Sequence, residues 1–274
     1  MSVISVTDIE ALKLEKLSRL CLSDFRVFCR VFWVVLNPGD ELNWHRGLEA
    51  IALHLQALYE GRIRRLGVAI PPGTGKSTIV SILFPLWCWC KNPTLRFISS
   101  THSLELSYIF NSKRLQVINS ERFQLVMRPK WKVDSSTSAN KGRLQNTMMG
   151  EIIATAVGAK VTGKHCHIFL LDDLLTPLEA RTSLRHKPMK YWDDTLRSRT
   201  VHKKNPMLVN VAQRLSVDDP HGVFRRRGVF DAEVVLPAIY DSKIDPGPTP
   251  IGWYDDRKQG ELLSEEYMDL ESCE

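Results

Sequence analysis

Short apolar runs recur along the chain and alternate with segments of helical periodicity. Uninterrupted apolar runs of this length are typical of strands that are covered on both faces of a sheet. Strands that alternate with helices predict an α/β fold, with a mainly parallel central sheet flanked by helices. The expected strands are Leu66–Ile70, Thr94–Ser99, Ile152–Ala156, Ile168–Leu171, Met207–Val211 and Val234–Leu236.

Three amphipathic segments precede the first expected strand. Thr7 and Glu10 have the spacing of a capping box, which predicts a helix that continues to about Arg19. Further helices are expected over Asp24–Val35, which ends before an Asn-Pro-Gly turn, and over His45–Tyr59. These segments predict a small helical subdomain ahead of the sheet, which would form a lid.

The remaining chain divides by composition into a core and a tail. Residues 1–60 would form the helical subdomain, residues 61–240 the α/β core and residues 241–274 an acidic linker or tail. The tail contains Pro246, Pro248 and Pro250, which favour an extended linker. Within the core, helices are expected over Lys76–Cys90 and Leu104–Ile118, and a hairpin turn at Gly150 after the polar loop that includes residues 135–140.

A glycine-containing loop joins the first expected strand to the next helix. It matches the P-loop (Walker A) pattern G-x-x-x-x-G-K-[ST] except at the first position, where Ile70 stands. Glycines let successive N–H groups turn toward phosphate oxygens, and a lysine can reach the β- and γ-phosphates of ATP. An incidental glycine turn is the alternative. The expected ATP-binding residues are Gly73, Thr74, Gly75, Lys76, Ser77 and Thr78, with Lys76 also catalytic.

Two carboxylates follow the apolar run Ile168–Leu171, which is the Walker B arrangement. Asp172 is the expected Mg²⁺ ligand, together with the hydroxyl of Ser77. The acid that polarises the attacking water would be Asp173, or else Glu179 if its loop folds back. Two aspartates that only cap a strand end are the alternative. A strand lies between the two motifs in the sequence, which favours the additional-strand class of P-loop NTPases.

Charge and cysteine content narrow the class of protein further. The 274 residues carry a net charge of +6, but the last twenty carry −6, so the body carries +12. A basic body favours a polyanionic partner such as nucleic acid. The six cysteines form no C-x-x-C pair, which favours buried, reduced thiols. No apolar segment has the length needed to cross a bilayer.

Basic residues gather in the stretch 181–204, which also contains Tyr191 and Trp192, and again at Arg225–Arg227. Either group of cations would suit the phosphates of DNA. The stretch would equally suit a solvated helix face or a surface between subunits. The basic residues of the stretch are Arg181, Arg185, Lys187, Lys190, Arg197, Arg199, Lys203 and Lys204.

Several short strings, taken in their order, resemble the large terminase subunit of tailed bacteriophages, and specifically its N-terminal ATPase domain. The resemblance spans roughly residues 25–270. The strings are Asn43–His45, Gly61–Leu66, Pro71–Ser77, Phe84–Trp87, Asn92–Pro93, Ser99–Ser103, Thr162–Lys164, Leu171–Asp173, Glu179–Arg181, Gln213–Leu215 and Leu236–Ala238.

This resemblance implies an ATPase that drives double-stranded DNA into a capsid in the host cytoplasm. It further implies a homo-oligomeric ring, a portal protein and a small terminase subunit as partners. Trp44 and His45 would contact adenine, although a buried aromatic with a polar cap would look identical. Gln213 and Arg214 would sense the γ-phosphate, or make structural hydrogen bonds only. Lys164 occupies the place of an arginine that acts on a neighbouring subunit, but lysine lacks the guanidinium fork.

The family's nuclease domain is expected to be absent, because only 36 residues follow Ala238. The acids among them, such as Asp255, Asp256 and Glu261, would have no scaffold to hold two metal ions. No nuclease activity is therefore expected. Two other functions fit the sequence: a helicase or loader driven by ATP, and an inactive truncated assembly module.

Overall fold

The computed structural model describes residues 6–134 and 141–265, so the polar run 135–140 lies outside the described residues. Its centre is a seven-stranded sheet with the order β3-β4-β2-β5-β6-β1-β7. All neighbouring strands are parallel except β3 and β4. The strands are β1 (Arg65–Ala69), β2 (Arg96–Thr101), β3 (Arg143–Gln145), β4 (Glu151–Ala156), β5 (Ile168–Asp172), β6 (Met207–Ala212) and β7 (Ala232–Val235).

The six expected strands form the parallel part of this sheet. Every residue of β4 and β5 is buried, because helices cover both faces and leave no solvated side that would require alternating polar residues. The strand that separates β1 from β5 in the sheet is β6, whereas β2 lies on the other side of β5. The strand inserted between β1 and β5 is therefore β6 and not β2, the strand that lies between the two motifs in the sequence.

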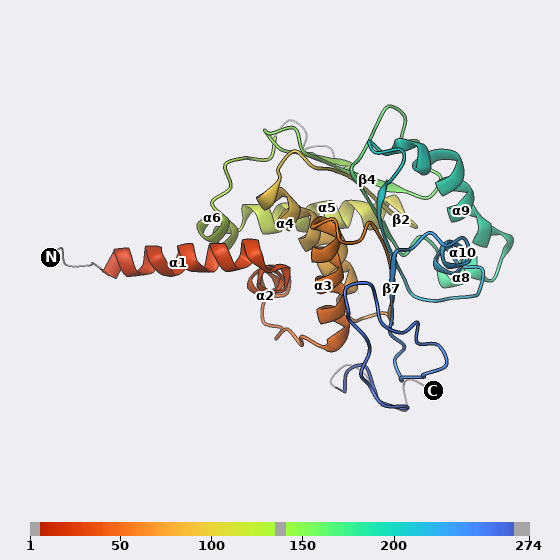
Figure 1. Cartoon of the computed structure of the whole chain (residues 1–274). Helices are drawn as coiled ribbons and strands as arrows, with labels where there is room; N and C mark the ends of the chain where they lie inside the picture. The colour runs from red at the N-terminus through yellow and green to blue at the C-terminus, as the bar shows by residue number, and fades with distance from the viewer. Residues whose placement is uncertain (1–5, 135–140, 266–274) are drawn as a thin grey trace.

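Helices pack on the sheet as two layers (Figure 1). One layer covers the face with the larger core cluster, in which Trp87, Trp89 and Phe97 are fully buried. The other layer covers a smaller cluster around Phe169, Trp192 and Phe224. The first layer contains α2 (Phe25–Leu36), α3 (Arg46–Tyr59), α4 (Phe84–Lys91), α5 (Leu104–Asn119) and α6 (Glu121–Met127), and the second contains α8 (Pro177–Ala180), α9 (Lys187–Tyr191) and α10 (Pro220–Arg226).

The first helix, α1 (Val6–Ser23), reaches away from the body and contacts it at α2 and α6 (Figure 1). Asp24 ends α1 and caps α2, since its carboxylate accepts a hydrogen bond from the backbone N–H of Arg26 at 2.8 Å. The expected capping box at Thr7 involves side chains outside the described set. Among the helices that the structure describes, none has both the length and the apolar character of a membrane span.

Residues 241–265 differ from the extended linker that the prolines predict. Leu263 is buried in the larger core cluster, and Trp253 packs against its edge and against the ring of His54. Asp255 and Arg257 form a buried ion pair at 2.7 Å, and Asp255 also pairs with Arg46 at 3.2 Å. The prolines therefore shape a segment that packs on α3, and the tail acid Asp255 helps to fix it there.

Candidate active site

The loop after β1 has the backbone geometry that phosphate binding requires. Gly73 and Gly75 have positive φ angles of 76° and 80°, a conformation that side chains with a Cβ disfavour. A Cβ atom at Gly75 would also lie 2.9 Å from the ring of Trp33. Helical structure begins at Lys76 and continues as the π-helix η1 (Thr78–Leu83). Glycine is therefore required at position 75 by conformation and by space.

Ile70, which replaces the usual first glycine of the motif, has a packing role. It is buried, and a Cβ atom at Gly47 would lie 2.5 Å from its Cδ1 atom. The glycine that allows close approach to Ile70 is Gly47, in the first turn of α3. This contact explains how the loop keeps its shape although the first position of the pattern fails.

The side chain of Lys76 is only 6% exposed, and its Nζ atom lies 3.4 Å from Oδ2 of Asp173. This buried Nζ atom has no hydrogen-bond partner in the described parts of the chain. A buried ammonium group without hydrogen bonds is costly unless a ligand completes its coordination. A phosphate oxygen in the cradle formed by Gly73–Gly75 would satisfy it.

Asp172 lies at the carboxyl end of β5, next to the helix that follows the loop. Its carboxylate accepts hydrogen bonds from Ser77 Oγ at 3.2 Å and from Ser81 Oγ at 2.6 Å. Burial, with the neighbouring charge of Asp173, raises the pKa of Asp172 to about 6. A buried carboxylate beside a hydroxyl is a donor set of hard oxygens that suits Mg²⁺. Ser77 and Asp172, the two expected metal ligands, are therefore brought together.

Asp173 adopts a left-handed conformation with φ 45°, unusual for a residue other than glycine. Its backbone is held on two sides, since its N–H donates to Val211 O at 3.0 Å and its carbonyl accepts from His102 Nδ1 at 3.1 Å. Its Oδ1 atom accepts the backbone N–H of Gln213 at 3.1 Å. With this unusual backbone conformation, the carboxylate lies between Lys76 and the end of β6.

The carboxylate of Glu179 has a different local role. Its Oε2 atom accepts hydrogen bonds from the backbone N–H and the hydroxyl of Thr176 at 3.0 and 2.9 Å. This is a capping box at the start of α8. Of the two candidate acids, Asp173 is the one that contacts Lys76.

His45 and Trp44 lie at the start of α3, and both have protein partners. His45 Nδ1 accepts the N–H of Gly47, so Nε2 carries the proton and donates to Thr74 O at 3.1 Å. Burial lowers the pKa of His45, which favours this neutral form. Trp44 donates to Glu49, and the Arg30 guanidinium lies 4.6 Å from the centre of its ring. These contacts make His45 a support of the phosphate loop, so the adenine hypothesis now depends mainly on Trp44.

Gln213 and Arg214 follow β6 at the same edge as the phosphate loop. Arg214 Nε donates to Asp219 Oδ2 at 2.9 Å, which positions the guanidinium at the start of α10. Both residues line a cavity of ≈ 280 Å³ whose other walls include Pro71, Pro72 and Leu236. The predicted pair therefore borders the loop, with Gln213 joined to Asp173 through its backbone.

Lys164 lies at the other edge of the sheet. Its Nζ atom is 3.6 Å from Oε1 of Glu151, the first residue of β4. The phosphate loop follows the carboxyl end of β1, and the parallel strands place these two edges on opposite sides. Lys164 is thus not brought to the loop of its own chain.

The sequence reasoning missed a buried arginine behind the site. Arg114 on α5 is fully buried and donates to Ser81 O at 2.8 Å and to Ser99 Oγ at 2.9 Å. Burial lowers the pKa of Arg114 to about 9, and the nearby Asp172 carboxylate opposes this effect. Ser81 thus connects Arg114 to Asp172, since its carbonyl faces the guanidinium and its hydroxyl faces the carboxylate.

Comparison with known proteins supports the resemblance to phage large terminases at the level of the fold. No family model matches the sequence, and no curated protein matches it. The large terminase of bacteriophage HK97 is similar in structure, with 15% identity, a TM-score of 0.50, and coverage of 79% of this chain and 45% of the HK97 chain. This chain has the fold of a phage large terminase.

A point mutant of the large terminase ATPase domain from Thermus phage P74-26 also matches, with 14% identity, a TM-score of 0.46, and coverage of 66% of this chain and 68% of that chain. The chain spans less than half the length of the HK97 protein. The resemblance to phage large terminases that the sequence predicts is confirmed as a likeness of fold.

Proposed function

We propose that this chain is the Mg²⁺-dependent ATPase domain of a viral DNA-packaging motor. The observation that carries the proposal is the buried Lys76 Nζ atom, which lacks a hydrogen bond and lies 3.4 Å from Asp173 beside two glycines of positive φ. The likeness of fold to a phage large terminase supports the choice of motor over other P-loop proteins.

Gly73, Thr74, Gly75 and Thr78 would hold the phosphates of ATP through the loop and the start of the helix. Ser77 and Asp172 would hold Mg²⁺, which when bound supplies positive charge to the phosphate oxygens. Lys76 would stabilise the charge that develops on the transferred phosphoryl group. Because this lysine is buried, its electrostatic effect would be stronger than in water.

Asp173 would orient the attacking water and accept its proton. Its left-handed backbone and its hydrogen bond from Gln213 N–H fix the carboxylate beside Lys76. A change at the γ-phosphate would thereby move Gln213 at the end of β6. Arg214, the next residue, would pass this movement to α10 through its hydrogen bond to Asp219. Glu179 is the second candidate for the acid, and Lys164 would act only on the ATP of a neighbouring subunit.

The partners follow from the terminase likeness and are part of the proposal. They are double-stranded DNA, the portal protein of the capsid, a small terminase subunit and further copies of this chain in a ring. The host cytoplasm would be the place of assembly. A helicase or loader would use the same ATP site, and an inactive assembly module would keep the fold without turnover.

The direct test measures phosphate release by the wild type, by Lys76→Ala and by a matched control, Lys113→Ala, which changes a partly exposed lysine on α5. Loss of Lys76 should lower hydrolysis at least about 100-fold, while the control keeps the wild-type rate. Activation by portal together with DNA supports a packaging motor, and activation by free DNA alone favours a helicase or loader. A wild-type rate no higher than that of Lys76→Ala, even with DNA and portal, contradicts the ATPase proposal.

A further inference from the structure

A large cavity lies at the edge of the sheet opposite the phosphate loop. Its volume is ≈ 730 Å³, and it includes Arg65 and Leu208, which are paired at the amino ends of β1 and β6. Four residue steps, or about 13 Å, separate Arg65 from Ala69, the last residue of β1 before the loop. The cavity therefore forms no part of the candidate ATP site.

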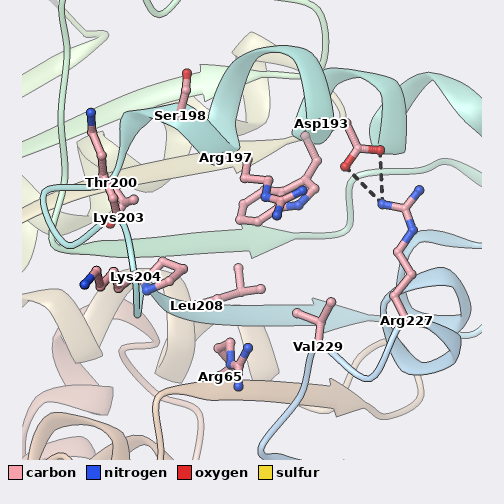
Figure 2. A pocket seen from close by; sticks show the side chains of 12 residues that line it. Arg65, Asp193, Arg197, Ser198, Thr200, Lys203, Lys204, Leu208, Arg227 and Val229 are labelled. Carbon is pink, nitrogen blue, oxygen red and sulfur yellow. Dashed lines mark hydrogen bonds and ion pairs between the residues drawn. The ribbon is translucent and has the colours of Figure 1, made fainter.

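Five cationic side chains and a single carboxylate line this cavity. Figure 2 shows that the cations surround it from three segments: Arg197 on a short 3-10 helix with Lys203 and Lys204 on the loop that follows it, Arg65 on β1, and Arg227 after α10. The carboxylate is that of Asp193, which forms an ion pair with Arg227 at 3.0 Å. The lining thus has a strong excess of positive charge.

Three of these cations are available to a ligand. Arg197, Lys203 and Lys204 are exposed, and in the described residues their side chains form no hydrogen bond or ion pair. Arg65 is partly neutralised by Asp231 at 2.5 Å. Trp192, Leu208 and Val229 supply apolar surface on which the aliphatic parts of long cationic side chains can lie.

The segment 197–204, which carries the free cations, is held by the residues that precede β5 and β1. Cys166 N–H donates to Arg199 O at 2.9 Å, and Val201 N–H donates to Cys166 O at 2.8 Å. Arg64 Nη2 donates to Asn205 O at 3.0 Å, which holds the residues that follow this segment. Because the backbone is already ordered, binding a ligand here costs less conformational entropy than ordering a free loop.

We infer that this cavity binds the backbone phosphates of double-stranded DNA. Exposed, unpaired cations spaced along a fixed loop suit a row of phosphates, and their charge gives a salt-dependent affinity without base recognition. The basic stretch 181–204 alone does not define the site, since Arg65 and Arg227 come from distant segments. DNA as the ligand rests on the proposed packaging function, but the cavity itself is independent of ATP.

The test measures binding of a fluorescent 30-base-pair duplex to the full chain, without ATP, across a range of salt concentrations. The double variant Lys203→Gln/Lys204→Gln removes two charges from the cavity. The control Lys243→Gln/Lys258→Gln removes two exposed charges from the tail segment. Loss of two phosphate contacts should weaken binding about 10- to 60-fold at 0.1 M salt and reduce the salt slope by about 1.8. The control should bind DNA like the wild type.

Equal losses in both variants, or no loss in either, would overturn the inference, because binding would then follow net charge or another surface. Pyrophosphate titrated alone provides the second arm. Tight binding of pyrophosphate that only the cavity variant loses, with equal DNA affinity, would assign the cavity to a small anion and also overturn it. Because this titration contains no ATP and does not depend on hydrolysis, failure of the ATPase proposal and failure of this inference are distinguishable.

Discussion

The two ends of strand β1 carry positive charge in opposite ways. At the carboxyl end, the Lys76 ammonium is buried and faces Asp173 at 3.4 Å. At the amino end, Lys203 and Lys204 are exposed and have no such partner among the described residues. A buried cation acts strongly on one fixed ligand, whereas exposed cations act weakly, additively and in a salt-dependent manner. One strand thus joins a site suited to chemistry and a surface suited to holding a polymer.

The largest expected effect is on the free energy of unfolding and concerns Arg114, the buried cation behind the site at the carboxyl end of β1. Arg114→Ala should lower the free energy of unfolding by about 3–5 kcal/mol, since it leaves the carbonyl of Ser81 and the hydroxyl of Ser99 without their donor in the core. Denaturant melts measure this loss. Lys113→Ala, one residue away on the same helix, should stay within about 0.5 kcal/mol of the wild type. Similar melts for the two variants would show that the buried cation does not stabilise the site.

The second effect separates the two candidate acids. Asp173→Asn should lower the rate of ATP hydrolysis about 100- to 1000-fold, because an amide cannot accept the proton of water. Glu179→Gln should change it by no more than about twofold, since Glu179 serves the capping box at Thr176. Phosphate release under saturating ATP provides the comparison. The reverse order of effects would transfer the acid role to Glu179.

The third effect concerns the pH dependence of the free energy of unfolding. Burial lowers the pKa of His54 to about 4, and its neutral ring can accept from Thr249 Oγ1 at 2.9 Å. Since the unfolded chain takes up the proton near pH 6.5, the folded state is favoured above that pH and loses this advantage as the pH falls toward 4. Between pH 7 and pH 5 the wild type should lose about 2 kcal/mol.

His54→Gln is the reference, because glutamine does not titrate. Thermal or denaturant melts at the two pH values should show a smaller loss for this variant than for the wild type. Equal losses would mean that other groups control the acid sensitivity.

The smallest effect tests the partial neutralisation of the cavity. Asp193→Asn removes the only carboxylate in its lining and releases Arg227, so DNA affinity should rise about two- to eightfold at 0.1 M salt. Anisotropy with the labelled duplex can resolve this change. Unchanged or weaker binding would indicate that Arg227 does not face the DNA.

The sequence predicts the parallel sheet and the two phosphate-site motifs well, because both depend on local patterns. The apolar run Ile168–Leu171 is sufficient to indicate a buried strand, and its two aspartates must then lie at the carboxyl edge. The contact between Ser77 and Asp172 follows from motif spacing. The contact between Ile70 and Gly47 does not, since it joins two segments that no local rule connects.

The burial of Arg114 can be predicted from its position in the sequence. Phe110, Val117 and Ile118 define the apolar face of α5, and Arg114 lies on that face at a spacing of four and three residues. A charged residue on an apolar helix face indicates a buried ion or a hydrogen-bonded core cation. The packed tail left no comparable signal, because its prolines fit an extended linker and a folded segment equally well.

The π-helix that follows the phosphate loop has a consequence for how this chain tolerates change. The segment Thr78–Leu83 contains one residue more than an α-helix would place in the same turn. Winding the same residues as a regular α-helix would rotate Ser81 relative to Lys76 by up to about 100°. The hydroxyl would leave Asp172, and the carbonyl would leave Arg114. A change that imposes α-helical winding on this apolar segment without shortening it should therefore be as damaging as substitution of a motif residue.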